Sequence, residues 1–326
     1  MKIIGLMPVY EESDWIEYAI EGIIDFVDEL VIAEGYMGPS WHFGTCRSGD
    51  DTIAILNRLA KKYSKITLVQ SQPRRHVLKG RAATYNHMLA SSKMAQESDW
   101  FMICDADEFY SEPQKEAIKK TILSTSADAV AVKARYFFFN FKNFIYVELP
   151  RLFRATSGMY FLPGQFPHYS TGKPYYSEKH PYQTILESDP MAHYSLVKRP
   201  TSEIKRRIME YCAAQRERWI FDWIDDVLLK WTPERAEEIY SLNERKYNGK
   251  GGIIYEGGCE AQKLMAYTGP HPEIMSGHPF RHIDDVRKVE FVASPASSYV
   301  LPRHHFANMI IRTMQKISSV LRRLRL

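Results

Sequence analysis

The chain has few cysteines and no paired cysteine motif. Among its 326 residues there are 4 cysteines, and none has the C-x-x-C spacing that zinc sites and redox sites use. They are Cys46, Cys104, Cys212 and Cys259. We interpret them as reduced thiols of a cytoplasmic protein rather than as a zinc site or a disulfide framework.

Long apolar runs and two common nucleotide-binding motifs are also missing. No stretch of about 18 uncharged apolar residues occurs, so the sequence does not predict a membrane-spanning helix. Met1 leads directly into a strand-like segment, residues 3–7, without the pattern of a signal peptide. The first predicted strand is not followed by G-x-G-x-x-G or by a P-loop, which disfavours dinucleotide oxidoreductases and P-loop kinases.

Acidic residues are missing from the end of the chain. The formal net charge is a mild +4, but no acidic residue follows Glu290. Apolar residues recur at helical spacing over residues 306–326, interspersed with arginines. A basic amphipathic helix within residues 301–326 can lie on an anionic membrane surface, here the inner face of the membrane. The alternatives are a helix packed on its own domain and a solvated tail.

What is present is ordinary globular composition, with 45% hydrophobic and 25% charged residues. The length allows one large domain or two modest ones. The chain is rich in aromatic residues, with 20 Tyr, 16 Phe and 6 Trp. Such residues line ligand clefts and interfaces, or pack cores.

Strand and helix patterns alternate over the first 125 residues. Ser13 is expected to cap the first helix, and Asp50 and Asp51 to open the second. Strands are expected at 2–9, 30–33, 66–69, 100–104 and 129–134, and further helices at 81–91 and 113–123. Regular alternation implies right-handed crossovers, and therefore an α/β fold with a doubly wound, mainly parallel sheet.

From Tyr136 onward the pattern changes to short aromatic strands and then to helices. The strands are expected at 136–141, 144–149 and 151–154, and the helices at 201–221 and 233–245. We expect residues 1–125 to bind a nucleotide, residues 126–300 to bind an acceptor, and residues 301–326 to form the basic C-terminal helix. Two histidine–proline segments, 267–272 and 276–279, form either a lid over the cleft or turns between small helices.

The most informative segment is SDWFMICDADEFY, residues 98–110. Its apolar run has the length of a buried strand and ends in Asp105, Asp107 and Glu108. Ligands of open α/β sheets bind outside the carboxyl ends of the strands, and two aspartates one residue apart there can both reach a divalent cation. The alternative is an acidic turn that caps a helix starting near Pro113.

Several motifs follow the order seen in family 2 glycosyltransferases, which have the GT-A fold. PVYEE at 8–12 resembles their PVYNEE opening, with Glu11 where the pattern has Asn. GRAATYN at 80–86 resembles their G-x-A-x-A-R-N helix start with the Arg displaced, and Asp105-Ala106-Asp107 resembles their D-x-D.

The second group of motifs is similar to the lipopolysaccharide-core sugar transferases of that family. It consists of PRLFR at 150–154, AHYS at 192–195 and Lys205. Each motif is weak alone, and the resemblance, which covers roughly residues 1–210, rests on their order and spacing.

The resemblance implies a metal site of Asp105, Asp107 and His193 that holds Mn²⁺ or Mg²⁺. Asp105 would contact the ribose or the metal, Asp107 would coordinate the metal, and His193 would be the second protein ligand. The alternative for His193 is a buried structural histidine. Glu108 would cap the following helix or brace the ligands. A divalent cation would neutralise the charge that grows on the diphosphate as the sugar leaves.

For the nucleotide, the resemblance implies a pocket formed by Pro8, Tyr10 and Glu12 at the end of the first strand. Glu34 stands where the family usually has a base-reading Asp, and its carboxylate can accept a hydrogen bond from the N–H of a uracil. Arg81 can pair with the diphosphate, because guanidinium matches phosphate geometry. The alternative for Glu12, Glu34 and Arg81 is ordinary loop charge.

An inverting transfer also needs a group that deprotonates the acceptor hydroxyl. The related transferases carry a His-Glu pair shortly after RLFR, whereas this chain has His168-Tyr169 there. The candidate bases are the carboxylates Glu148, Glu178, Glu187 and Asp189, with His168 and His180 as second choices. Asp189 and Glu187 are favoured because they precede His193 on the same segment. A retaining mechanism, which needs no such base, stays open.

Together these patterns predict a metal-dependent glycosyltransferase that moves a sugar from a nucleotide-diphosphate donor, with UDP-sugar favoured, to a glycan or lipid-linked saccharide. One alternative is a nucleotidyltransferase, but residues 8–15 lack the Gly, Lys and Arg of its loop. Another is a non-catalytic nucleotide- or carbohydrate-binding protein, favoured by the missing His-Glu carboxylate. A nucleic-acid-binding role is disfavoured because the positive excess lies mainly in the tail.

Overall fold

The computed structural model describes residues 1–38, 46–156, 159–163, 167–168, 183–185, 190–197, 223–247 and 264–286. Several predictions fall outside these residues: the candidate bases Glu187 and Asp189, the helix at 201–221, and the basic helix within 301–326. No helix among the described residues is long and apolar enough to cross a membrane.

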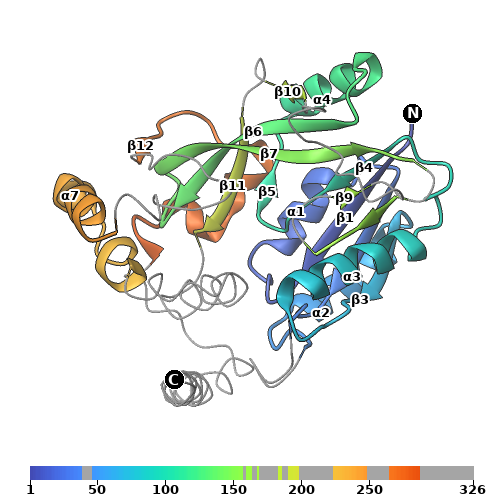
Figure 1. Cartoon of the computed structure of the whole chain (residues 1–326), viewed down its shortest axis with the longest axis horizontal. Coiled ribbons are helices and arrows are strands. Elements are labelled where there is room, and N and C mark those ends of the chain that lie inside the picture. The colour runs from blue at the N-terminus through green and yellow to red at the C-terminus, as the bar shows by residue number, and fades with distance from the viewer. Residues whose placement is uncertain are drawn as a thin grey trace, which may run out of the picture.

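The first half of the chain forms a doubly wound parallel sheet (Figure 1). Its strands are β1 (Ile3–Val9), β2 (Glu29–Glu34), β3 (Ile66–Gln70) and β4 (Trp100–Ile103), in the spatial order β3-β2-β1-β4. Neighbouring strands in this part are parallel. The order reverses between β1 and β4, so the carboxyl ends of these two strands flank the topological switch point, where open α/β sheets bind ligands.

The same sheet continues beyond β4 with strands of mixed direction. β7 (Asn143–Arg154) pairs antiparallel with both β4 and β6 (Ala129–Phe138). β11 (Met191–Leu196) pairs parallel with β6 and antiparallel with the short β5 (Glu108–Phe109). The short strands are β8 (Tyr160–Phe161), β9 (Pro167–His168), β10 (Gln183–Ile185) and β12 (Met265–Ala266). These pairings confirm the predicted α/β class and the doubly wound, mainly parallel sheet of the first half.

Helices cover both faces of the parallel half because β1 alternates its side chains between two cores. Ile3, Met7 and Val9 pack in the core that includes α1 (Ile16–Ile23) and α2 (Thr52–Lys62). Ile4 and Leu6 pack in the opposite core with α3 (Val77–Ser91). Alternation with a period of two is the expected consequence of strand geometry. The helix α4 (Glu112–Ser124) follows β5, and α7 (Ala236–Tyr247) lies at the other end of the molecule from α2 and α3 (Figure 1).

Two predicted helix starts differ from the structure. Ser13 does not cap α1; its backbone N–H donates to Asp50, and the carbonyl of Glu12 accepts from the N–H groups of Trp15 and Ile16 instead. α3 begins at Val77, one turn before the predicted start. The acidic turn after β4 does not cap α4, which was the alternative to a metal site. Ser111 caps this helix, because its side chain accepts from the N–H of Gln114.

The lengths predicted for the aromatic strands after Tyr136 are wrong. β6 and β7 each run without the predicted breaks, through Arg135 and through Pro150. Pro150 is tolerated because the pairing of β7 with β6 passes from Leu152 directly to Pro150, which leaves Arg151 as the extra residue of a β-bulge. Proline within a strand is found at such bulges because it cannot donate a backbone hydrogen bond.

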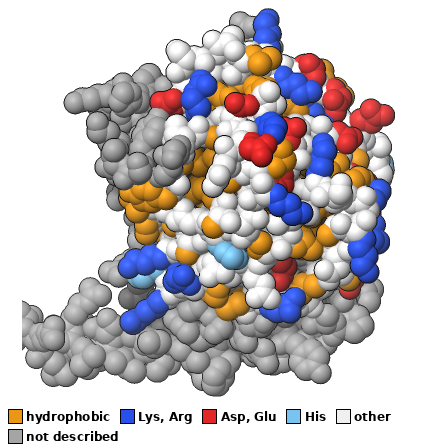
Figure 2. Space-filling view, turned by 90° about the vertical axis from the view of Figure 1, so that its right-hand side faces the viewer, with side chains coloured by type: hydrophobic (Ala, Val, Ile, Leu, Met, Phe, Trp, Pro, Cys, Tyr) orange, Lys and Arg blue, Asp and Glu red, His pale blue; other side chains and the backbone are white. Residues whose placement is uncertain are grey.

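The C-terminal described part consists of short elements. A π-helical turn (Ile224–Leu228) and a 3₁₀ turn (Pro233–Arg235) precede α7, and two 3₁₀ turns follow at Glu273–Gly277 and Pro279–His282. The predicted helix at 233–245 therefore exists but begins as 3₁₀. Figure 2 shows one face of the molecule, on which basic and acidic side chains are interspersed with hydrophobic ones.

Candidate functional site

The candidate site lies where β4 ends beside β1. Residues 105–107 form the turn between β4 and β5, and the N–H of Glu108 donates to the carbonyl of Asp105 across it. Asp107 and Glu108 are buried, whereas the side chain of Asp105 is 23% exposed. Three carboxylates therefore lie at the switch point of the sheet, as the sequence predicts, and one of them reaches solvent.

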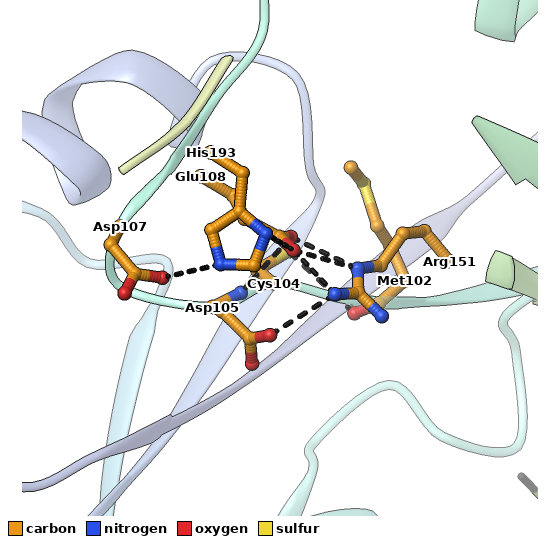
Figure 3. Close-up of polar contacts among 7 residues, drawn as sticks. All are labelled: Met102, Cys104, Asp105, Asp107, Glu108, Arg151 and His193. Atoms are coloured by element: carbon orange, nitrogen blue, oxygen red, sulfur yellow. Dashed lines mark hydrogen bonds and ion pairs between the residues drawn. The ribbon is translucent and has the colours of Figure 1, made fainter. Parts of the chain in front are cut away.

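Arg151 enters this group from β7 (Figure 3). Its Nε lies 3.0 Å from both carboxylate oxygens of Glu108, its Nη2 also contacts Glu108, and the same Nη2 lies 3.1 Å from Asp105 Oδ2. Arg151 is 8% exposed. A forked guanidinium on a carboxylate is a strong, directional pairing, and a buried one fixes both partners.

His193 lies on the opposite side of the acidic group, between two carboxylates (Figure 3). Its Nε2 is 3.3 Å from Asp107 Oδ1, and its Nδ1 is 3.6 Å from Glu108 Oε1. The residue is only 4% exposed, and Nδ1 is buried without a hydrogen-bond partner. The structure thus brings together the predicted Asp105, Asp107 and His193, and adds Glu108 and Arg151 to them.

Two irregularities of the backbone aim these side chains. Arg151 is the extra residue of the bulge in β7, and a second register shift in β11 begins directly after His193. Bulges re-aim side chains and are common beside active sites. The turn 105–107 is tied to β11 because the N–H of Tyr194 donates to the carbonyl of Asp107 at 2.9 Å.

The electrostatics of the group follow from burial and close opposite charges. Burial lowers the pKa of Arg151, but Glu108 and Asp105 outweigh it and hold that pKa well above the usual value. Burial raises the pKa of Glu108, an effect that Arg151 opposes. Burial lowers the pKa of His193, yet Asp107 and Glu108 outweigh it, and the net pKa is raised. The cluster therefore attracts positive charge.

A divalent cation fits the donor atoms present. Ligand atoms at right angles on an octahedral cation with bonds of about 2.1 Å lie about 3.0 Å apart, close to the 3.3 Å between Asp107 Oδ1 and His193 Nε2. Asp105, Glu108 and His193 also offer ligand atoms within 4.8 Å of one another. The orphaned Nδ1 of His193 is a further sign that this site is built for a bound group.

The predicted donor-binding residues at the tips of β1 and β2 lie around one loop. Glu34 Oε1 accepts from the N–H of Ser48, and its Oε2 is 3.7 Å from Arg47 Nε. The N–H of Glu12 donates to Thr52 Oγ1, and Glu12 is 7% exposed. Pro8 is opposite Ala33 in the β1–β2 pairing. The ring centroid of Tyr10 is 5.4 Å from that of Tyr36.

Arg81 lies on the first half of α3. Burial raises the pKa of Tyr85 to about 12, and the charges of Arg81, Asp105 and Arg151 all act on the same phenol. Gly80, the residue before Arg81, allows α3 to approach the segment after β2, because a β-carbon there would stand 1.7 Å from the carbonyl oxygen of Met37.

Other predicted residues lie apart from the cluster. Glu148 is exposed on β7 opposite Lys133, three residues before Arg151. His278 is buried, with Nε2 2.9 Å from the carbonyl of Asp14 and its ring stacked 4.1 Å from Trp15. His271 lies 2.6 Å from the hydroxyl of Tyr194. His278 therefore lies in the packed interior between two 3₁₀ turns, whereas His271 is half-buried.

Arg151 was not predicted as a site residue, although it lies in the PRLFR motif at 150–154. The available signal was a proline followed by an arginine inside an otherwise apolar strand pattern. A proline there favours a bulge, and a bulged arginine can face a buried acidic group. Of the two roles expected for Glu108, the structure places it as a brace, since it accepts from Arg151 and does not cap α4.

Comparison with known proteins gives distant structural likenesses only. No family model matches the chain, and no curated protein matches it. Residues 1–349 of TarS from S. aureus in complex with UDP share 12% identity over 75% of this chain and 80% of that one, with a TM-score of 0.40. The same TarS fragment in complex with UDP-GlcNAc shares 16% identity over 44% of this chain and 39% of that one, with a TM-score of 0.31.

A second likeness is to glucosyl-3-phosphoglycerate synthase from Mycobacterium tuberculosis in complex with Mn²⁺ and UDP-glucose. It shows 18% identity over 42% of this chain and 43% of that one, with a TM-score of 0.27. The chain therefore spans less than half of this enzyme and of the TarS fragment in its UDP-GlcNAc complex.

Proposed function

We propose that the protein is a metal-dependent glycosyltransferase that uses a nucleotide-diphosphate sugar, with UDP-sugar favoured, and a glycan or lipid-linked saccharide acceptor. One observation carries this proposal: at the switch point of a doubly wound sheet, His193 of β11 lies 3.3 Å from Asp107 of the β4–β5 turn and shares a second group of close ligand atoms with Asp105 and Glu108. Carboxylates and an imidazole at that position suit a cation that a diphosphate can share.

In this proposal Asp107 and His193 would hold the cation, and Asp105 would contact the ribose or the cation. Bound there, Mn²⁺ or Mg²⁺ would neutralise the charge that develops on the leaving diphosphate. Arg81 would add a guanidinium to the same phosphates. Pro8, Tyr10 and Glu12 would line the nucleoside, and Glu34 would read the base, because its carboxylate oxygens can each accept a second hydrogen bond.

The reaction would transfer the sugar between two oxygens. The bond from the anomeric carbon to the β-phosphate oxygen breaks with its electron pair leaving on the diphosphate, and the acceptor oxygen forms the new bond. The acceptor proton passes to a base if the configuration inverts. Asp189, Glu187 and Glu148 remain the proposed bases, of which Glu148 alone is described and is exposed.

A ligand screen by thermal unfolding tests the proposal. We expect one nucleotide-diphosphate sugar to raise the melting temperature in the presence of MnCl₂ and to have little effect in EDTA, because a ligand that binds only the folded state stabilises it. The nucleoside without phosphates serves as the control for binding through the base alone. A screen in which every sugar nucleotide gives the same melting curve with and without Mn²⁺ contradicts the proposal.

A further inference from the structure

A basic segment joins β3 to α3. No acidic residue occurs in residues 52–96. Within that range, the sequence RRHVLK includes the exposed basic side chains of Arg74, Arg75 and Lys79. The first turn of α3, which begins at Val77, also contains no acidic residue. We call the three basic side chains the 74–79 patch, and no acidic residue nearby in the sequence neutralises it.

The 74–79 patch also lacks counter-charges from other elements, unlike two basic side chains of α2. Arg58 Nη2 lies 2.6 Å from a carboxylate oxygen of Glu17 on α1, and Lys62 Nζ lies 2.7 Å from one of Glu21. The helix α1 thus neutralises part of the charge of α2. Among the residues that the structure describes, no carboxylate forms an ion pair with the 74–79 patch. Its positive charges are therefore open to an anionic partner.

Two aliphatic side chains lie between the basic ones. Val77 and Leu78 are each partly exposed, and neither belongs to the two hydrophobic cores on the faces of the sheet. Basic side chains around an aliphatic pair suit the surface of an anionic bilayer, where cations meet lipid phosphates and apolar groups enter between the headgroups. Single-stranded nucleic acid would favour aromatic side chains that stack on bases, and residues 74–79 contain no Trp, Tyr or Phe.

Backbone contacts fix the 74–79 patch at the edge of the sheet that carries the candidate site. The N–H of Ser71, directly after β3, donates to the carbonyl of Glu34 at 2.9 Å. The N–H of Arg74 donates to the carbonyl of Met37 at 3.1 Å. The segment is thus attached to the carboxyl end of β2 and to the residues that follow it. Because β1 to β4 are parallel, the acidic turn after β4 lies at the same edge.

We propose that the 74–79 patch docks the protein on a membrane surface that contains anionic phospholipids. Arg74, Arg75 and Lys79 contact the lipid phosphates, and Val77 and Leu78 lie at the level of the headgroups. The docking does not depend on the proposed function. Its use in catalysis does rest on that function: docking brings the carboxyl edge of the sheet to the bilayer, where a lipid-linked acceptor lies.

Sedimentation of the full chain with lipid vesicles tests the proposal. We expect wild type to pellet with vesicles that contain phosphatidylglycerol and not with phosphatidylcholine alone. The triple variant Arg74→Gln, Arg75→Gln, Lys79→Gln should need at least about 10-fold more anionic lipid, because each basic side chain near such a surface strengthens binding about 5-fold. A triple variant that pellets like wild type overturns the proposal, and so does wild type that does not prefer the anionic vesicles.

The matched control removes three positive charges from α2 instead, through Arg58→Gln, Lys61→Gln and Lys62→Gln. These side chains are exposed, and α2 covers the opposite face of the sheet from α3. The control should pellet like wild type, and an equal loss of binding would show that net charge alone governs the association. A single-stranded oligonucleotide serves as the second ligand. If wild type binds it and does not pellet with anionic vesicles, the partner is nucleic acid and the proposal is wrong.

Chemical labelling of wild type gives a readout that needs no variant. Lys79 and Lys61 both carry exposed amines, on α3 and α2. We expect anionic vesicles to slow the acetylation of Lys79 several-fold and to leave that of Lys61 unchanged, because lipid headgroups cover only the first. Mass spectrometry measures both rates in one sample. Acetylation of Lys79 at the same rate with and without anionic vesicles overturns the proposal.

Discussion

Gly80 shows how a single residue positions a predicted donor-binding side chain. Its missing β-carbon lets α3 lie against the carbonyl of Met37, and Arg81 follows directly. We expect Gly80→Ala to lower the free energy of unfolding by about 2 kcal/mol or more, because a β-carbon at 1.7 Å must displace backbone. Urea denaturation followed by circular dichroism measures this.

Gly277→Ala is the matched control for that substitution. A β-carbon at Gly277 would meet nothing within 4 Å, so the change should stay within about 0.5 kcal/mol. Equal stability of the Gly80 and Gly277 variants would show that the approach of α3 to Met37 is not needed.

Glu11 has a backbone conformation that is unfavourable for glutamate, and its position in the PVYEE motif could have indicated this. Its φ is +52°, in the left-handed region that asparagine adopts more readily than glutamate. It stands where the family 2 pattern has Asn, and its N–H donates to Ser48 Oγ. The local conformation at the tip of β1 is therefore held by the loop that also contacts Glu34, rather than by residue preference.

At the scale of elements, β1 to β4 could be predicted to within one or two residues. Each is a short apolar run bounded by polar residues, and such runs end where the strand leaves the core. β6 and β7 could not, because Pro150 breaks the apolar pattern although the strand continues through a bulge. A bulge depends on the partner strand, and the register of the partner is not written in the local pattern.

In the candidate site, too, the residues marked by a local sequence pattern could be predicted, and a contact between distant segments could not. Asp105 and Asp107 could be predicted because they follow a recognisable apolar strand, whereas His193 was predicted only from the resemblance of AHYS at 192–195 to a family motif. Glu108 could be assigned only as a cap or a brace, since its partner Arg151 comes from a strand 43 positions later. The pairing of β7 with β4 and the bulge in β7 create that contact, and neither is visible in residues 98–110.

At the scale of the whole molecule, the buried His278 and the half-buried His271 link the C-terminal turns to the core and make stability depend on pH. Burial lowers the pKa of His278 to about 4 and that of His271 to about 4. In the unfolded chain each should titrate near 6.5. Both are thus neutral in the folded protein, and their contribution is present above about pH 6.5 and lost as the pH falls toward 4.

We therefore expect the free energy of unfolding to fall between pH 6.5 and 4, by at most about 3 kcal/mol for His278 and by less for the half-buried His271. His278→Asn keeps an acceptor for the N–H of Phe280 and should reduce this slope. Urea denaturation at several pH values measures it. The exposed His282 provides the control, and His282→Asn should keep the wild-type slope. A slope that does not respond to His278→Asn would contradict the assignment.

The central claim is that the acidic turn after β4 holds a cation to which a diphosphate binds. Calorimetric titration of UDP into the full chain, with MnCl₂ or with EDTA, tests it most directly in wild type, Asp107→Asn and Asp25→Asn. Asp25 is an exposed aspartate before β2, at the opposite edge of the sheet, and serves as the control. The account predicts Mn²⁺-dependent binding that Asp107→Asn weakens by about 10- to 100-fold and Asp25→Asn leaves unchanged. Binding by Asp107→Asn as tight and as Mn²⁺-dependent as in wild type would contradict it.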